Sequence, residues 1–262
     1  SLYRASNYAQ IYGDGDGMFY DDSVNFVIEN GVLKKYNGWQ TFVEIPDTVT
    51  TIGDEAFKNN TSMVSVSIPD SVKSIGDSAF YGCTSLLGVV IPDSVEKIGS
   101  YAFQKCSKLA SAYLPVNEKF TVINTCTFYE CISLKEIIVP DNIVKIEDNA
   151  FWSCSKLKNV KLSLGLEYLG RYAFSHCDNL ESIKIPKSLE KCGLYHDNNK
   201  AVGPFSYCEK LKTIEFEEGT TEIAEALLAG CTQLEKLTIP GTVTVIENKG
   251  MANCSSLTDI NI

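Results

Sequence analysis

Few side chains in this sequence are suited to acid–base or nucleophilic catalysis. The 262 residues include two histidines, His176 and His196, and ten cysteines. A nucleophile needs a base within hydrogen-bonding reach, and histidine serves most often as that base. His176 aligns with Asn59, Gly82, Lys105 and Glu130 in other copies of an internal repeat, so we expect this side chain to face solvent without a catalytic task. We therefore predict that the protein is not an enzyme.

Two short patterns contain residues that could bind a metal ion, and neither is complete. Cys192-x-x-x-His196 offers two ligands, whereas a structural zinc site needs four and no further Cys or His pair lies nearby. Asp14-Gly-Asp16 is similar to the start of a calcium loop, but Met18 stands where a third oxygen ligand belongs. We expect no metal and no cofactor, and we interpret the segment around Asp14 as a flexible acidic turn.

The cysteines recur at a fixed spacing that argues against disulfides. Eight of them hold one position of a 23-residue frame: Cys83, Cys106, Cys131, Cys154, Cys177, Cys208, Cys231 and Cys254. Equivalent side chains on stacked coils point in the same direction, so we predict a buried ladder of reduced thiols. Cys192 takes an otherwise aliphatic position and should be buried, whereas Cys126 aligns with Glu55 and Ser78 and should be the most exposed. Reduced thiols in this number fit either the cytosol or an anaerobic exterior.

The frame is clearest from Ile68 to Val90. It has Ile at position 1, Pro at 2, Val at 5, Ile at 8, Ala-Phe at 12 and 13, Cys at 16, Leu at 19 and Val at 22. Self-similarity at a fixed period predicts a solenoid. The fourth copy carries two extra residues and the seventh carries eight. The nine copies, here coils 1 to 9, begin at Ile45, Ile68, Ile91, Leu114, Val139, Leu162, Ile185, Phe216 and Ile239.

Each coil contains signals for one strand and one turn. Position 22 and position 1 of the next coil are apolar with one variable residue between them, which predicts a short strand ended by proline at position 2. The Ala-Phe pair begins a segment with apolar spacing of three, which favours a short helical turn on the opposite side. The sequence therefore predicts an α/β repeat solenoid of about nine coils with one parallel sheet face.

The chain divides into three parts. Residues 1–25 read as an irregular lead-in, and residues 26–44 as a hairpin around Asn30-Gly31 that covers the apolar end of the first coil. Residues 45–262 form the repeat array. The extra residues of coil 7, within 194–203, are expected to form a mobile surface loop whose deletion leaves thermal stability nearly unchanged.

The pattern I-P-x-x-V-x-x-I-G-x-x-A-F-x-x-C-x-x-L-x-x-I closely resembles the BspA-like class of bacterial leucine-rich repeats. That resemblance implies a right-handed array in a secreted or surface-attached protein, often a module of a longer chain, that binds host or neighbour proteins. Coils 7 to 9 depart from the pattern at Pro204-Phe205, Leu227-Leu228 and Gly250-Met251. Because the chain stops at Ile262, the first residue of a tenth frame, we expect a fragment or a last repeat completed by something else.

Charge and hydropathy exclude two kinds of partner. Thirty-three acidic and 23 basic residues give a net charge of −10, which repels nucleic acid and anionic lipid. No stretch approaches the roughly 18 to 20 apolar residues that span a membrane. No secretion signal is visible, although one could have been removed. We expect an extracellular or cell-surface monomer with a protein or glycan ligand.

Frame position 23 lies between two inward positions, so its side chain should point outward from the strand face. Three apolar or aromatic residues and two lysines follow one another there, and an exposed cluster of this kind is typical of a contact surface, although Val, Tyr and Ile also simply favour strands.

We also expect Tyr195 and His196 in the insertion to contact a ligand. The first hypothesis is a noncatalytic interaction or adhesion module, and the alternative is a structural spacer of a longer surface protein. The predicted binding face consists of Val90, Tyr113, Ile138, Lys161 and Lys184.

Overall fold

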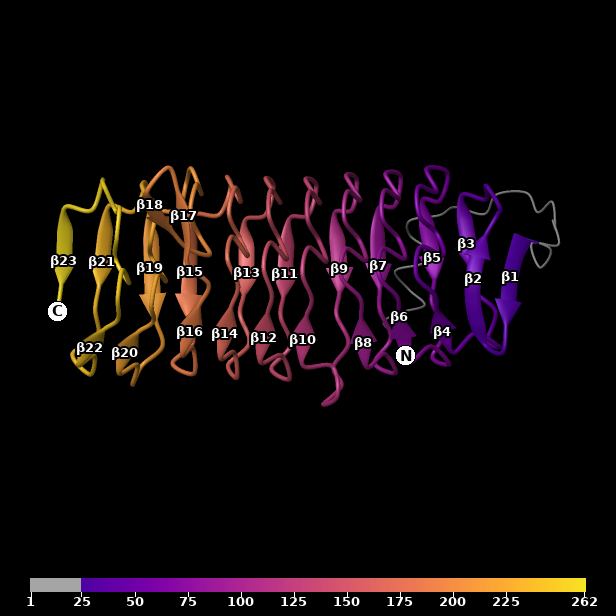
Figure 1. Ribbon diagram of the computed structural model, residues 1–262, viewed down its shortest axis with the longest axis horizontal. Helices are drawn as coiled ribbons and strands as arrows, with labels where there is room; N and C mark the ends of the chain where they lie inside the picture. Colours follow the sequence, from indigo (N-terminus) through magenta and orange to yellow (C-terminus); the bar gives the residue numbers. More distant parts are fainter. Residues whose placement is uncertain (1–24) are drawn as a thin grey trace.

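The chain winds into an elongated solenoid of short strands and turns (Figure 1). The computed structural model describes residues 25–262, and these contain no α-helix. The acidic turn around Asp14 and nearly all of the lead-in expected for residues 1–25 lie outside the described residues. The solenoid is confirmed, whereas the helical part of the predicted α/β class is wrong.

One row of strands occupies frame positions 21 to 23 and begins one residue before the predicted strand, which runs from position 22 to position 1 of the next coil. They pair in parallel as β3–β5, β7–β9, β11–β13 and β15–β19–β21–β23. The outward surface of this row is the strand face. The row begins one strand before coil 1, in the cap. Its members are β3 (Phe42–Glu44), β5 (Ser65–Ser67), β7 (Gly88–Val90), β9 (Ser111–Tyr113), β11 (Glu136–Ile138), β13 (Asn159–Lys161), β15 (Ser182–Ile185), β19 (Thr213–Phe216), β21 (Lys236–Thr238) and β23 (Asp259–Asn261).

A second row of two-residue strands, not predicted from the sequence, occupies frame positions 7 and 8. These strands also pair in parallel, and their ladder is interrupted between β8 and β10 and between β16 and β20. The interruptions fall where coils 4 and 7 carry their extra residues. The row comprises β4 (Thr51–Ile52), β6 (Ser74–Ile75), β8 (Lys97–Ile98), β10 (Val122–Ile123), β12 (Lys145–Ile146), β14 (Tyr168–Leu169), β16 (Lys191–Cys192), β20 (Glu222–Ile223) and β22 (Val245–Ile246).

The Ala-Phe segment forms tight turns because its backbone enters the left-handed region twice in nearly every coil. At position 11, Tyr101 has φ 60° and Cys126 has φ 55°. At position 15, Asn59 has φ 60° and Gly82 has φ 69°. A left-handed residue ends a right-handed helical run, so two of them four residues apart leave no room for a helix.

Stacked phenylalanine rings form the centre of the core. Each ring at position 13 lies 4.8 to 5.6 Å from the next, with interplanar angles between 3° and 15°. The stack ends after coil 7, because Leu228 and Met251 occupy the equivalent positions. Its members are Phe57, Phe80, Phe103, Phe128, Phe151, Phe174 and Phe205.

The cysteine ladder lies against this stack. Each ladder thiol donates to the carbonyl oxygen of position 13 in the preceding coil, for example Cys106 Sγ to Phe80 O at 3.2 Å. Burial is confirmed for seven of the eight, while Cys254 is half-buried. The exposure expected for Cys126 is wrong: only 7% of it is accessible, and burial beside Asp148 raises its thiol pKa to about 11. All ten cysteines are free thiols, and Cys192 is buried as predicted.

The predicted N-terminal hairpin is confirmed. Strands β1 (Phe26–Glu29) and β2 (Val32–Tyr36) pair antiparallel around Asn30 and Gly31, both of which have positive φ. Tyr36 is 5% exposed and its ring lies 5.3 Å from that of Phe57, so the hairpin extends the aromatic stack and covers the first coil.

Candidate interaction surface

The strand face carries an exposed apolar row at its centre. Exposure rises from 39% for Val90 through 57% for Tyr113 to 63% for Ile138. The preceding residues on these strands, Val89, Ala112 and Ile137, are buried. The predicted orientation of position 23 is therefore confirmed for this row. Lys161 and Lys184 are also exposed, Lys161 beside Ile138 in the β11–β13 pair and Lys184 beside Glu215 in the β15–β19 pair.

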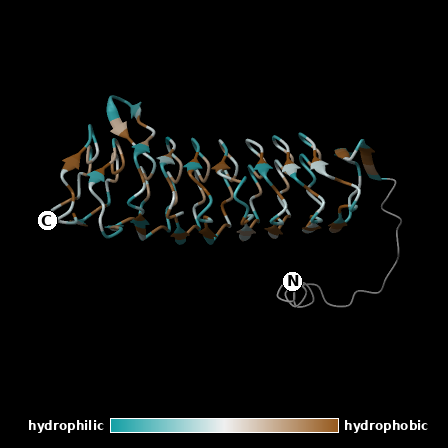
Figure 2. Ribbon diagram, turned by 90° about the horizontal axis from the view of Figure 1, so that it is seen from below, coloured by the Kyte–Doolittle hydropathy of each residue, from teal (hydrophilic) through white to brown (hydrophobic). Residues whose placement is uncertain are grey.

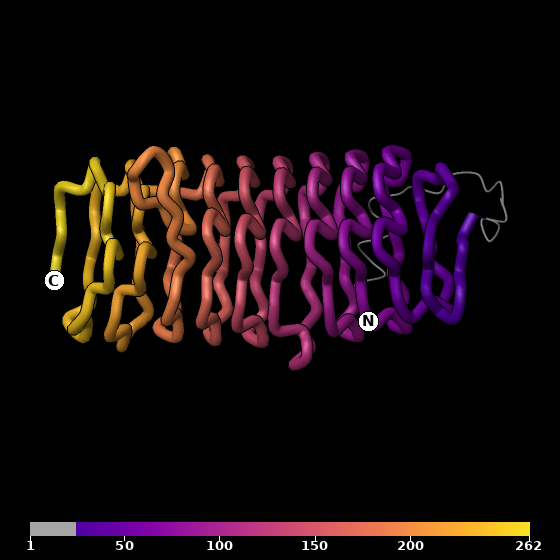
Figure 3. Tube along the Cα trace, viewed as in Figure 1, coloured from indigo at the N-terminus to yellow at the C-terminus, as the bar shows by residue number. Residues whose placement is uncertain are grey.

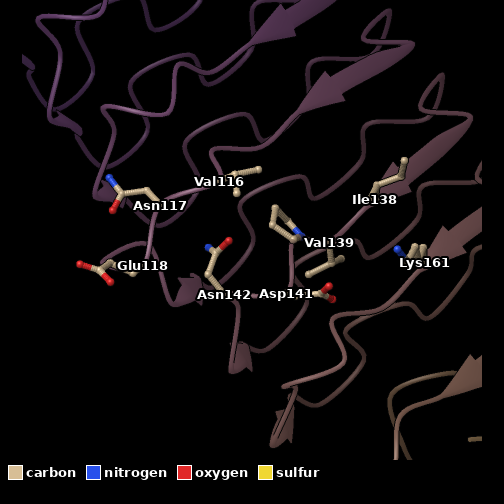
Figure 4. Close-up of a pocket in the computed structure, with 9 residues that line it drawn as sticks. Val116, Asn117, Glu118, Ile138, Val139, Asp141, Asn142 and Lys161 are labelled. Atoms are coloured by element: carbon tan, nitrogen blue, oxygen red, sulfur yellow. The ribbon is translucent and has the colours of Figure 1, made fainter.

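A shallow hollow of about 420 Å³ opens beside this row, at the edge where the strands end (Figure 4). Its floor and walls come from three successive layers, those of β9, β11 and β13. Apolar side chains line its centre, while carboxylates, amides and one lysine stand around them. The lining residues are Val116, Asn117, Glu118, Ile138, Val139, Pro140, Asp141, Asn142 and Lys161.

The two extra residues of coil 4 shape this hollow. They bulge from the lower edge of the solenoid in Figure 3 and lie just after Val116, which is 71% exposed. Asn117 secures the bulge: its Nδ2 donates to Asp93 O at 2.9 Å, and its Oδ1 accepts from Lys119 N at 2.9 Å. Phe120 then returns to the core at 1% exposure. The bulge is thus an ordered departure from the frame.

A second hollow of about 310 Å³ adjoins the first on the strand face. Its lining includes Glu136, Lys158 and Ser182. Ile138 and Lys161 border both hollows, so these two residues of the predicted face are its centre. Sequence reasoning missed Val116 and Glu118, for which the two-residue insertion in coil 4 was the available signal.

The charges around the hollows are arranged in order along the solenoid. Glu118 and Glu136 lie toward the β9 and β11 layers, and Lys161 lies on β13. Within residues 25–262, none of these three side chains forms an ion pair, whereas Lys158 pairs with Glu181 at 3.2 Å. The hollows therefore have an acidic side and a basic side that are both open to a ligand.

Asn142 forms part of the wall with its amide oxygen unsatisfied. Its Nδ2 donates to Phe120 O at 2.5 Å, but its enclosed Oδ1 has no hydrogen-bond partner in the described part of the chain. Ser71 at the equivalent position donates its hydroxyl to Val49 O at 2.7 Å and has no second polar atom to satisfy. An enclosed unpaired acceptor costs about 1–3 kcal/mol.

The insertion of coil 7 is a docked β-hairpin, so the predicted mobile, dispensable loop needs correction. Strands β17 (Tyr195–Asp197) and β18 (Lys200–Val202) pair antiparallel around Asn198 and Asn199, both with positive φ. The hairpin stands out from the line of coils in Figure 2, yet Ala201 and Val202 are buried at its base.

Small residues of coils 8 and 9 receive the hairpin. Ala201 packs with Ala226 and Ala229, and Ala252 lies against them. A Cβ on Gly203 would lie 2.0 Å from Ala226 O, so this position requires glycine. These side chains form a notch that admits the hairpin backbone.

Polar contacts close the hairpin onto its neighbours. Tyr207 Oη donates to Asp197 Oδ2 at 2.6 Å, and burial together with this carboxylate raises the tyrosine pKa to about 12. Asn253 Nδ2 donates to Ala201 O at 2.8 Å, and Lys249 Nζ lies 2.7 Å from His196 Nε2. Tyr195 and His196 are exposed, but they lie over coils 6 to 9 and do not join the apolar row.

A half-buried aromatic row along the turns was also missed. Tyr129 stacks on Trp152 with centroids 4.6 Å apart, and His176 stacks on Tyr207 at 5.1 Å. Trp152 meets His176 edge-on at 5.3 Å. These rings pack mainly against one another, so the row stabilises the turns of coils 4 to 7.

Residues 25–262 contain no group of three or more His, Cys, Asp or Glu side chains placed to hold a metal ion. The same range also lacks a helix long and apolar enough to cross a membrane.

Comparison with known proteins identifies the fold family. A leucine-rich repeat protein from Eubacterium ventriosum is 27% identical over 74% of this chain, with a TM-score of 0.61, and the match spans about half (52%) of that protein. One from Bacteroides ovatus is 27% identical over 85% of this chain and 72% of its own, with a TM-score of 0.51. The T. pallidum leucine-rich repeat protein is 26% identical over 78% and 82%, with a TM-score of 0.55.

No curated protein matched the sequence. Residues 28–124, 112–200 and 201–262 match the profile of the BspA type leucine rich repeat region. The chain therefore belongs to the BspA-type leucine-rich repeat family.

Proposed function

We propose that the chain is a noncatalytic interaction module that binds a protein or glycan through the strand face between β7 and β13. The observation that carries this proposal is the exposed apolar row of Val90, Tyr113 and Ile138, which continues into the hollow at Val116. Exposed apolar groups in one patch are characteristic of contact surfaces. Tyrosine adds a flat face for packing and a hydroxyl for hydrogen bonding.

The scaffold favours binding over catalysis. The coils bury most of their apolar residues in the core, and many polar side chains bond neighbouring coils, such as Ser94 Oγ to Val72 O at 2.7 Å. The apolar row on the strand face is the exception, because Val90, Tyr113 and Ile138 remain exposed instead of entering the core. Repeat solenoids of this shape typically present such a face to a partner.

Membership in the BspA-type family supports a place outside the cell. We propose a secreted or surface-attached protein with an adhesive role, monomeric and without a cofactor. The net charge of −10 supports a protein or glycan partner over nucleic acid.

A binding panel with matched variants tests the proposal. The purified chain is assayed against extracellular-matrix proteins and glycans, and then Tyr113→Ser combined with Ile138→Ser is compared with Tyr101→Ser combined with Ile132→Ser. The control pair has the same residue types, each 42% exposed, at the turns. We expect the strand-face pair to weaken binding about tenfold or more and the control pair to leave it unchanged. A flat response to the panel favours a spacer, and equal effects of both pairs overturn the assignment of the face.

A further inference from the structure

The hollow beside β11 has an acidic side, an apolar centre and a basic side. Figure 4 shows Glu118 on one side and Lys161 on the other, with Val116 and Val139 between them. Asp141 also lines the hollow, but its Oδ1 accepts from Leu164 N at 3.0 Å and helps to bind the next layer. Glu118 and Lys161 make no ion pair with other residues of the described range, so both remain open to a partner.

We propose that the hollow binds an extended protein segment in which one large apolar side chain stands between a cationic and an anionic side chain. The apolar side chain enters between Val116 and Ile138. The cationic group pairs with Glu118, and the carboxylate pairs with Lys161. This inference rests on the proposed function and specifies its partner.

The spacing of the layers fits such a segment. Glu118 lies five residues beyond the end of β9 and Lys161 lies on β13, two layers further along. The two layers correspond to roughly 10 Å along the solenoid, and the offset along the strands adds to this separation. Alternate residues of an extended chain point to the same side about 7 Å apart, so cation, anchor and carboxylate at every second position span roughly 13 Å. Flexible Lys and Glu side chains on both partners accommodate the difference between the spacing of the two protein charges and the span of the peptide.

Charge and lining favour a peptide over the other occupants of such a hollow. A neutral glycan would leave Glu118 and Lys161 unpaired, and the centre of the hollow is aliphatic, with Val116, Ile138 and Val139. A large side chain there removes this surface from water, which contributes about 25 cal/mol per Å² of apolar area.

The test uses four labelled synthetic peptides with glycine spacers and measures their binding to the chain by fluorescence anisotropy. The first is Lys-Gly-Trp-Gly-Glu. The second replaces Trp by Gly, and the others carry two lysines or two glutamates as the charged pair. We expect the first to bind best, at least tenfold more tightly than the peptide without Trp and about two- to fivefold more tightly than either charge variant.

Charge exchange on the protein makes the test specific. Lys161→Glu should reverse the preference toward the double-lysine peptide, and Glu118→Lys should reverse it toward the double-glutamate peptide. Lys97→Glu, at an exposed lysine of the second strand row, serves as control and changes neither. All three residues are on the surface, so folding is not at risk.

Two outcomes overturn this inference: equal binding of all charge patterns, or no binding of the Trp peptides. If the strand-face variants still abolish binding to the protein or glycan panel, the proposed function stands and only the peptide pattern is wrong. If neither assay depends on Ile138, both proposals fail.

Discussion

Coils 4 and 7 both interrupt the 23-residue period, and they do so at opposite edges of the solenoid (Figure 3). In coil 4 the extra residues form a surface bulge that follows Val116, which is 71% exposed. In coil 7 they form the β17–β18 hairpin, which buries Ala201 and Val202 against coils 8 and 9. Both also interrupt the ladder of the second strand row.

The difference shows that an insertion is accommodated in two ways. The bulge of coil 4 satisfies its own backbone through Asn117 and creates a hollow, while the neighbouring coils keep the ordinary frame. The hairpin of coil 7 needs changes elsewhere, with alanine at 226, 229 and 252 and glycine at 203. The first insertion adds surface, and the second adds core.

Deleting each insertion in turn should give the largest difference in the free energy of unfolding between the two coils. Removal of Tyr195–Val202 restores the frame of coil 7 but loses the buried Val202 and uncovers the alanine notch, so we expect the free energy of unfolding to fall by about 3 kcal/mol. Removal of Glu118 and Lys119 turns the bulge into Leu-Pro-Val-Asn-Phe, the pattern of other coils. It breaks a surface ion pair with Glu96 and the hydrogen bond from Lys119 N to Asn117, and we expect a change within about 1 kcal/mol.

Urea unfolding of both deletion variants measures the two values. Equal losses in the free energy of unfolding would mean that the hairpin stabilises the fold no more than the bulge does. The coil 4 deletion should also abolish discrimination between the charged peptides, because it removes Glu118.

A single substitution in the notch should reproduce part of the hairpin effect. Ala229→Leu places a larger side chain under β18, and overpacking of this kind costs about 1–3 kcal/mol. Gln104→Leu changes the same frame position in coil 3, where no hairpin lies, and should stay within about 0.5 kcal/mol. Thermal unfolding of the two variants checks this, and a loss in Gln104→Leu equal to that in Ala229→Leu would refute the notch.

Two asparagines near the bulge should respond in opposite directions. Asn142→Ser keeps a donor for Phe120 O and removes the enclosed Oδ1, so we expect a gain of about 1 kcal/mol. Asn117→Ser loses the bond from Lys119 N and should lower stability by about 1 kcal/mol. Urea unfolding midpoints of the pair decide between these signs, and a loss for Asn142→Ser would show that its oxygen is satisfied in solution.

Much of the solenoid could be predicted from the sequence because burial repeats at fixed positions. Apolar alternation predicts the strand of each coil to within one residue, and Asn30-Gly31 predicts the cap hairpin. The helical turn was wrong because apolar spacing of three fits both a helix and a pair of left-handed turns. Asn59 and Gly82 at position 15 are residue types that favour the left-handed region, and they were the available signal.

The site could be predicted only in part. Outward orientation of Tyr113 and Ile138 follows from the alternation of a strand, so the strand face was found. The hollow depends on the position of Val116 and Glu118 relative to the next layer. The periodic sequence pattern does not predict that position. The hairpin was taken for a mobile loop because its partners, Ala226 and Ala229, lie more than 20 residues further along the chain.

The contact between Tyr207 and Asp197 should have the smallest effect and a distinct pH dependence. Tyr207→Phe removes one hydrogen bond to a carboxylate near the surface, so we expect a loss of about 0.5–1 kcal/mol at neutral pH. Burial and Asp197 raise the pKa of Tyr207 from 10.0 to about 12, so the folded protein holds the phenolic proton more tightly than the unfolded chain. This contribution is therefore complete below pH 10 and is lost as the pH rises from about 10 to 12. Unfolding free energies of the protein and of Tyr207→Phe, measured in parallel across that range, should converge at the alkaline end. A stability difference that stays constant with pH would assign the loss to ring packing. Asn117→Ser in the bulge of coil 4 serves as the control, because the bulge has no tyrosine–carboxylate contact. The stability difference caused by Asn117→Ser should not change over the same pH range.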